Sequence, residues 1–144
     1  MRRIYQRALI TGATSGIGKA FAEALPVETG LLLTGRDEAK LAELRDRFAV
    51  SGRTVEIVPA DLRMPADRRR LTETAEAFQA DLFVNNAGIG FFSHFVETSA
   101  EDEAAMVEVN VVAVHELTHL LLPGMLNRAE EAGARAGLII VSSV

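Results

Sequence analysis

Three glycines in the order Gly-x-x-x-Gly-x-Gly follow a short apolar run at residues 8–10 and precede a segment of helical pattern. Glycine lets the backbone turn tightly and lets a ligand approach the main chain closely. A helix N-terminus adds unpaired N–H donors and the positive end of the helix dipole, which together favour a phosphate group. A strand, a glycine-rich turn and a helix in this order are therefore typical of a dinucleotide-binding site. The residues expected to form it are Gly12, Thr14, Ser15, Gly16, Ile17 and Gly18.

Further candidate residues follow the later apolar runs of the chain. In open α/β sheets, ligands bind at the carboxyl ends of the strands, so polar residues at these places are candidates for the same site. The Asn-Asn-Ala-Gly turn after residues 82–84, with Asn86, Ala87 and Gly88, lies at such a place. Asp61 and Leu62 follow residues 55–58, and Ser142 and Ser143 follow residues 138–141.

Short apolar runs alternate with longer segments of helical period, which is typical of a parallel sheet covered on both faces. We expect strands near residues 7–11, 31–34, 54–58, 82–85 and 138–142. We expect helices near residues 17–25, 37–49, 64–80, 100–112 and 113–132, the last two forming either separate helices or one continuous run. Asp37 and Ser99 are predicted N-caps. The run Arg68-Arg69-Arg70 is interpreted as a solvated helix face.

Right-handed crossovers and one reversal of strand order predict an open, doubly wound parallel sheet, Rossmann-like, with the order 3-2-1-4-5. The fifth strand, residues 138–142, would then form an apolar edge of the sheet. An exposed apolar edge tends to pair with another chain, so we expect association, exchange or poor solubility of the isolated polypeptide. As partners we expect a small-molecule substrate and further copies of the chain in a homo-oligomer. Residues 1–144 are treated as one dinucleotide-binding domain.

The glycine spacing and the Asn-Asn-Ala-Gly turn that starts at Asn85 resemble the motifs of the short-chain dehydrogenase/reductase family. The resemblance covers essentially the whole chain. It implies that Asp61 holds the adenine, that Asn110 supports a water-linked proton relay, and that Ser143 is the catalytic serine. That serine would donate a hydrogen bond to the oxygen of a small carbonyl or alcohol substrate during hydride transfer.

The same family uses a tyrosine, followed four residues later by a lysine, as its proton donor. Here the tyrosine is Tyr5 and the lysines are Lys19 and Lys40, so the sequence has no Tyr-x-x-x-Lys pair. We therefore expect the amino-terminal part of a reductase, truncated after the fifth strand, which binds cofactor but is inactive alone. A non-catalytic cofactor-binding module is the alternative.

The end of the second predicted strand bears on the choice between NADP and NAD. NAD-dependent relatives usually carry aspartate where Gly35 stands, and Arg36 resembles the phosphate-binding arginine of NADP-dependent relatives. A guanidinium can bind a phosphate through two charge-assisted hydrogen bonds. We expect NADP as the cofactor, with NAD as the alternative.

The segment His115-Glu116-Leu117-Thr118-His119 matches His-Glu-x-x-His, a zinc-protease signature that places two imidazoles on one helix face. A zinc-dependent hydrolase is therefore an alternative of another reaction class. No Gly-x-x-His follows, and the flanking apolar residues are typical of a packing surface. We expect no metal site.

Composition excludes other classes of partner and chemistry. A net charge of −5 gives no electrostatic reason to expect nucleic acid or an anionic membrane. The absence of cysteine excludes disulfides and thiolate catalysis. The first residues lack a signal-like apolar core, and no apolar run approaches the roughly 20 residues of a membrane span. We expect a cytoplasmic protein.

Overall fold

The computed structural model describes residues 5–142 and contains a five-stranded sheet in the order β3-β2-β1-β4-β5, with every neighbouring pair parallel. This arrangement confirms the predicted open, doubly wound parallel sheet. The strands are β1 (Arg7–Thr11), β2 (Gly30–Gly35), β3 (Val55–Pro59), β4 (Leu82–Asn85) and β5 (Gly137–Ile140).

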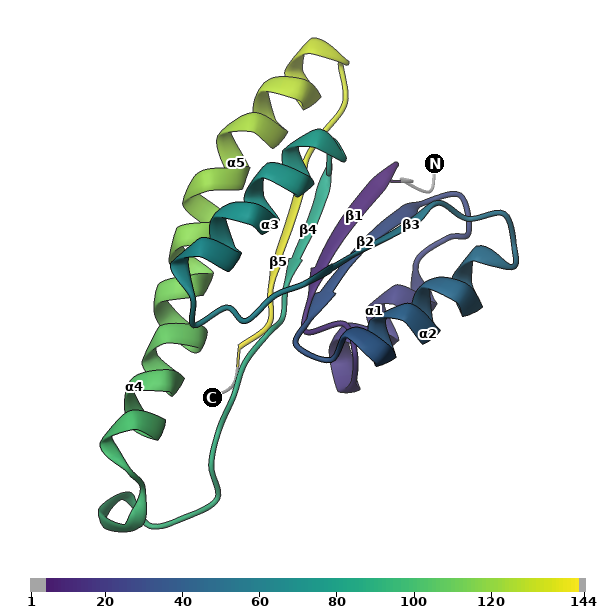
Figure 1. The fold of residues 1–144 in the computed structure, drawn as a ribbon. Coiled ribbons are helices and arrows are strands. Elements are labelled where there is room, and N and C mark those ends of the chain that lie inside the picture. The colour runs from purple at the N-terminus through teal and green to yellow at the C-terminus, as the bar shows by residue number, and fades with distance from the viewer. Residues whose placement is uncertain (1–4, 143–144) are drawn as a thin grey trace.

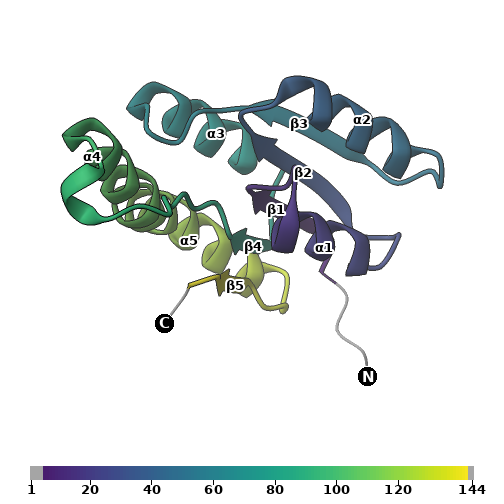
Figure 2. The ribbon, with the colours of Figure 1, turned by 90° about the horizontal axis from the view of Figure 1, so that it is seen from below.

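Helices cover both faces of the sheet (Figures 1 and 2). α1 and α2 lie on one face, and α3 and α5 lie on the other. The helical elements are α1 (Gly16–Ala24), α2 (Glu38–Ala49), α3 (Pro65–Ala77), the short 3-10 helix η1 (Phe95–Glu97), α4 (Ala100–Val107), the π-helical η2 (Glu108–Ala113) and α5 (Val114–Glu131).

Alternate residues of each central strand build two separate cores. Leu9, Leu32 and Phe83 point to the face covered by α3 and α5. Their strand neighbours, such as Ile10 and Leu33, point to the face covered by α1 and α2. Because side chains alternate across a strand, a strand buried on both faces is apolar throughout, as the sequence pattern indicated.

The two helices expected over residues 100–132 form one continuous helical run, interrupted in its hydrogen-bonding pattern by η2. A π-turn inserts one extra residue into a helix and is frequently found at functional sites. The run carries Asn110 within this turn.

Several expected helix boundaries hold and one differs. Asp37 accepts a hydrogen bond from the Lys40 amide at 3.0 Å, and Ser99 accepts one from the Asp102 amide at 3.1 Å, so both predicted caps are confirmed. α3 ends at Ala77 rather than near residue 80, because Gln79 adopts a left-handed φ of 57° that stops the helix.

The run of three arginines does not form a uniformly solvated face. Arg69 and Arg70 are exposed, as expected, but the Arg68 side chain is only 3% exposed. The interpretation of Arg68 as a solvated residue is therefore wrong.

The run Ala100–Glu131 is long and apolar enough to cross a membrane by length and composition alone. The sequence-based expectation that no segment approaches this length did not treat the two helices as one. One such helix is weak evidence, since the core helix of a soluble protein passes the same test. Here the buried residues Leu117, Leu121 and Met125 pack in the sheet's core.

β5 forms the edge of the sheet, and Ile139 and Ile140 are 36% and 49% exposed. An apolar edge strand offers unpaired main-chain groups to a second chain. We predict that the polypeptide of residues 1–144 self-associates, with a weight-average mass that rises with concentration in analytical ultracentrifugation. Ile140→Lys, which places a charge on the edge, should shift the distribution toward monomer, whereas a wild-type monomer at high concentration would contradict the prediction.

Candidate cofactor site

The turn between β1 and α1 is built from glycines because side chains would not fit. Gly12 has a φ of 65°, which favours glycine. Gly18 lies so close to this turn that a Cβ there would collide with the Gly12 carbonyl oxygen and with the Asn86 side-chain nitrogen. The same Asn86 nitrogen donates to the carbonyl oxygens of Thr11 and Gly12 at 3.0 and 3.3 Å. These hydrogen bonds hold the turn that follows β4 (the β4 turn) against the glycine turn.

The N-terminus of α1 presents a positive and sterically open end. Ser15 is its N-cap, makes no capping hydrogen bond through its side chain, and no acidic residue lies in the first turn. The first N–H groups of a helix have no partner within the helix. A Cβ placed at Gly16 would meet no side chain or distant main-chain atom within 4 Å, so this position is open. This is a cradle suited to a phosphate group.

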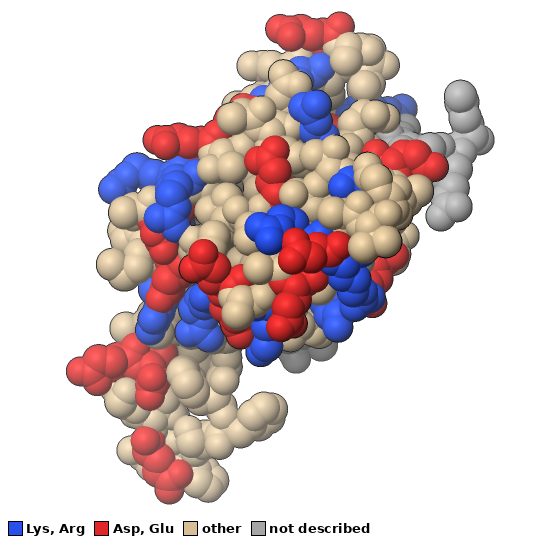
Figure 3. Space-filling model, turned by 45° about the vertical axis from the view of Figure 1, so that its right-hand side comes forward, with Lys and Arg blue, Asp and Glu red and all other residues tan. Residues whose placement is uncertain are grey.

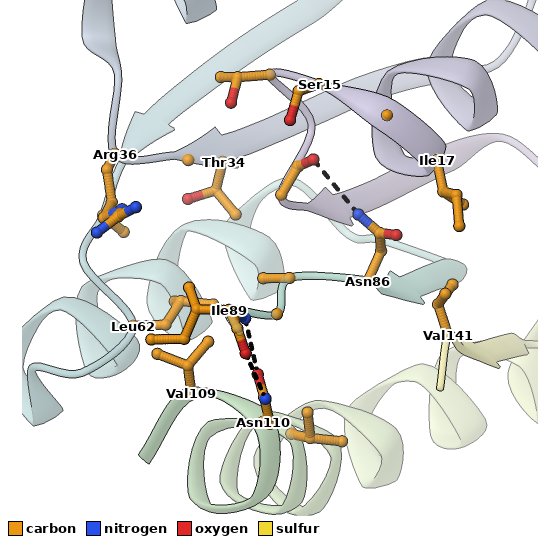
Figure 4. Close-up of a pocket in the computed structure, with 18 of the residues that line it drawn as sticks. Ser15, Ile17, Thr34, Arg36, Leu62, Asn86, Ile89, Val109, Asn110 and Val141 are labelled. Carbon is orange, nitrogen blue, oxygen red and sulfur yellow. Dashed lines mark hydrogen bonds between the residues drawn. The ribbon is translucent and has the colours of Figure 1, made fainter. Parts of the chain in front are cut away.

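A cavity of about 690 Å³ lies at the carboxyl ends of the strands, in front of this helix (Figure 4). Arg36 and Leu62 lie toward one end of it, and Ile17 and Val141 toward the other. Most of the residues expected from the sequence line this cavity: Gly12, Thr14, Ser15, Gly16, Ile17, Arg36, Asp61, Leu62, Asn86, Ala87, Gly88 and Asn110.

One expected site residue does not line the cavity, and another lies outside the described residues. Gly18 lies behind the turn, where its contacts with Gly12 and Asn86 make it a packing residue rather than a wall of the cavity. Ser143 lies outside the described residues. Its neighbour Ser142 lines the cavity.

Positive charge gathers at the end of the cavity formed by β2 and β3. The Arg36 side chain forms no hydrogen bond or ion pair with another of residues 5–142, whereas the Arg63 side chain binds Asp61 through Nε at 3.0 Å and Nη2 at 2.5 Å. The hydrogen bond from the Arg63 side chain holds the pKa of Asp61 below its usual value, and the charge of Arg36 contributes to the lowering. The Arg36 guanidinium is therefore available to an anionic ligand.

The lowered pKa of Asp61 makes a prediction about acid stability. Because the folded pKa lies below the unfolded value of about 3.9, ionised Asp61 stabilises the fold above that pH, and the contribution disappears as pH falls through the folded pKa. We expect the unfolding free energies of wild type and Asp61→Asn to differ by a constant amount from about pH 5 to 7 and to converge below about pH 4. Chemical denaturation at each pH measures this, and a difference that grows on acidification would contradict it.

Asn110 uses both ends of its amide on the loop after β4. Its Oδ1 accepts a hydrogen bond from the Ile89 amide at 2.9 Å, and its Nδ2 donates to the Ile89 carbonyl at 2.8 Å. Figure 4 shows this pair at the wall of the cavity. The side chain thus fixes the loop that carries Ala87 and Gly88.

Sequence reasoning missed residues that shape the site. Thr11, buried at the end of β1, accepts hydrogen bonds through Oγ1 from the amides of Asn86 and Ala87, each at 2.9 Å. Arg63 and Val109, which also line the cavity, were missed as well. Their places in the sequence could have indicated them, because Thr11 directly precedes Gly12 and Arg63 directly follows Leu62.

The His-Glu-x-x-His segment lies on α5, where its members do not converge on a metal. The rings of His115 and His119 stack in parallel with centroids 6.1 Å apart. Glu116 is engaged elsewhere, since its Oε2 accepts from Arg68 Nε at 2.7 Å. Within the described part of the chain, no group of three or more potential ligands is placed to hold a metal ion. The alternative of a zinc hydrolase gains no support from this geometry.

The parallel sheet, the glycine turn and the helix N-terminus at the cavity define the class of α/β dinucleotide-binding folds. Comparison of sequences narrows this class, since the profile of the family described as short chain dehydrogenase matches residues 6–144. The chain belongs to the short-chain dehydrogenase/reductase family.

The proteins similar to this chain include several oxidoreductases. An uncharacterised oxidoreductase of Staphylococcus saprophyticus is 37% identical over 126 residues, covering 85% of this chain and 54% of that protein. A family member from Burkholderia phymatum, solved in complex with NAD, has a TM-score of 0.84 and 34% identity, covering 97% of this chain and 50% of its own. L-sorbose reductase from Gluconobacter frateurii, complexed with NADPH and L-sorbose, has a TM-score of 0.80 and 32% identity, covering 88% and 49%. The chain spans about half the length of the curated relatives it matches.

Proposed function

We propose that the chain is a dinucleotide-binding domain of an oxidoreductase that transfers a hydride between NADP and a small carbonyl or alcohol substrate. The observation that carries the proposal is the open helix N-terminus at Ser15 and Gly16, facing a cavity that also contains Arg36. Similarity to family members solved with NAD or with NADPH and L-sorbose supports a nicotinamide cofactor and a small substrate.

Different residues along the cavity would bind different parts of the cofactor. The amides at Ser15, Gly16 and Ile17 would bind the pyrophosphate, and the Arg36 guanidinium would bind the 2′-phosphate that distinguishes NADP from NAD. Asp61 and Leu62 would border the adenine. When bound, the nicotinamide would supply the hydride.

The remaining residues would serve the nicotinamide end of the cavity. Asn86, Ala87 and Gly88 would border the cofactor at the end of β4. Asn110 would hold the neighbouring loop and contribute to proton transfer, and Ser143 would donate a hydrogen bond to the substrate oxygen. A donor at that place helps most in the transition state, when the oxygen gains negative charge.

We further propose that the functional protein is cytoplasmic and homo-oligomeric. Exposed apolar side chains along the long helical run support an oligomer. These side chains are Val107, Val111, Leu120 and Leu126.

Residues 1–144 contain no Tyr-x-x-x-Lys pair, so we propose that this polypeptide binds cofactor without turning it over. Isothermal titration calorimetry with NADPH and NADH, combined with an absorbance assay for NADPH oxidation by a panel of ketones, tests both parts. We expect heat of binding, a higher affinity for NADPH than for NADH, and no ketone-dependent oxidation of NADPH. The absence of heat with either nucleotide would refute the cofactor assignment, and ketone-dependent oxidation would refute the inactivity of the polypeptide.

A further inference from the structure

Arg68 on α3 is buried outside the cavity but contacts two parts of its wall. Its Nη1 donates at 2.7 Å to the carbonyl oxygen of Leu62 and, also at 2.7 Å, to Oε1 of Glu108. Its Nε donates to Oε2 of Glu116 at 2.7 Å. The neighbouring Arg69 is exposed, and its side chain has no hydrogen bond or ion pair with the rest of residues 5–142. Arg68 is therefore the one member of this pair with a structural connection to the site.

The two carboxylates that bind Arg68 lie at the start of the π-turn and shortly after its end. Glu108 is the first residue of η2, and Glu116 lies in the first turn of α5. In a regular α-helix, residues eight positions apart diverge by about 80° around the axis. A π-turn absorbs one extra residue, so eight positions across it correspond to seven and diverge by about 20°. The π-helical register therefore brings both glutamates closer to one face, the face toward α3, which runs beside α5 (Figure 1).

The π-turn in turn presents residues to the cavity. Asn110 lies within η2 and holds the Ile89 main chain through two hydrogen bonds, at 2.9 and 2.8 Å. The buried Val109 lines the cavity beside it. The third contact of Arg68 is the carbonyl of Leu62, on the wall formed by the loop after β3. One guanidinium thus bridges two walls that come from distant parts of the sequence.

A buried ion pair by itself is weak evidence of a stabilising role, because desolvation offsets the attraction between the charges. We propose that Arg68 is a positioning residue that holds η2 in its π-helical register. Through that register it fixes Asn110 against Ile89, and its contact with the Leu62 carbonyl holds the neighbouring wall. The consequence for cofactor affinity rests on the proposed function, whereas the consequence for the Asn110–Ile89 contact does not.

Amide hydrogen exchange of the free protein, measured by NMR, tests the proposal. Arg68→Met removes the guanidinium, and Glu108→Ala releases one side of the turn while leaving Arg68 bound to Glu116 and the Leu62 carbonyl. We expect the Ile89 amide to exchange about tenfold faster in both variants. Its acceptor is Oδ1 of Asn110 in η2, and both variants remove the charge-assisted hydrogen bond between Arg68 and Glu108 that holds η2. Arg69→Met is the matched control and should leave exchange unchanged.

Two further readings separate positioning from general stability and from the proposed function. The amide of Leu41, buried in α2 on the other face of the sheet, should exchange at the wild-type rate in each folded variant. Equal acceleration at Ile89 and Leu41, or unchanged exchange at Ile89 in Arg68→Met, would overturn the proposal. If Arg68→Met does not fold, Glu108→Ala decides by the same criterion.

NADPH affinity provides the second readout on the same proteins. We expect the dissociation constant for NADPH to rise about fivefold in Arg68→Met and in Glu108→Ala, and to stay unchanged in Arg69→Met. Unchanged affinity in a variant with faster Ile89 exchange would overturn the link from η2 to the cofactor cavity. A wild-type protein that binds no NADPH would refute the proposed function, while the exchange result would still decide whether Arg68 holds the turn.

Discussion

Gly18→Ala is expected to abolish NADPH binding and to destabilise the fold by about 3 kcal/mol. The added methyl group would collide with the Gly12 carbonyl oxygen and the Asn86 side-chain nitrogen. Neither atom can move away easily. The Gly12 oxygen belongs to the backbone, and the Asn86 nitrogen is hydrogen-bonded to the carbonyl oxygens of Thr11 and Gly12. The start of α1 would have to move away from the glycine turn, which would displace the amides proposed to bind the pyrophosphate.

Calorimetric titration with NADPH and denaturant unfolding measure the two effects of Gly18→Ala. Gly90→Ala is the matched control, since a Cβ there meets no atom within 4 Å and the residue has no left-handed φ. The control should bind and unfold like the wild type. Wild-type NADPH affinity in a folded Gly18→Ala variant would contradict the role assigned to this close contact.

Arg36→Ala is expected to weaken NADPH binding about 100-fold, equivalent to about 2.7 kcal/mol, and to change NADH binding by less than about threefold. The selectivity follows from the 2′-phosphate, which NADH lacks. Arg36 has no ion-pair partner among the described residues, so its removal leaves no protein carboxylate unpaired. Gly35 supplies no carboxylate, and a Cβ there would lie 3.0 Å from Thr14 Cγ2.

Arg36→Lys separates charge from geometry in this prediction. Lysine keeps the positive charge but cannot form the two parallel hydrogen bonds of a guanidinium, so an intermediate NADPH affinity is expected. Arg63→Ala tests the neighbouring cation, which is already bound to Asp61. If Arg36→Ala binds NADPH as tightly as wild type, the assignment of Arg36 to the 2′-phosphate is wrong.

The elements that hold the site were predictable because their signals are local. Apolar runs and helical periodicity placed the strands, and the glycine spacing placed the turn before α1. The strand order also followed from general rules of connection, and the observed order β3-β2-β1-β4-β5 agrees with it. These features depend on residues that are neighbours in sequence or on rules shared by all such sheets.

Other features depend on contacts that no local pattern encodes. In the sequence, Arg68 is part of a basic run, yet its ion-pair partners Glu108 and Glu116 lie at least 40 positions away. Thr11 reads as the end of a strand, yet it accepts hydrogen bonds from amides of the β4 turn. The π-turn also has no periodicity of its own over so short a segment, so the run from residue 100 to 132 read as ordinary helix.

The most direct measurement of the central claim is an NMR titration of the amide resonances with NADPH. The account predicts the largest shifts at Gly16 and Ile17, where the helix N-terminus faces the cavity, with smaller shifts at Leu62 and Gly88. Arg135, at the opposite end of the sheet, should not respond. Saturable binding that leaves the Gly16 and Ile17 amides unshifted, or shifts confined to the region of Arg135, would contradict the account.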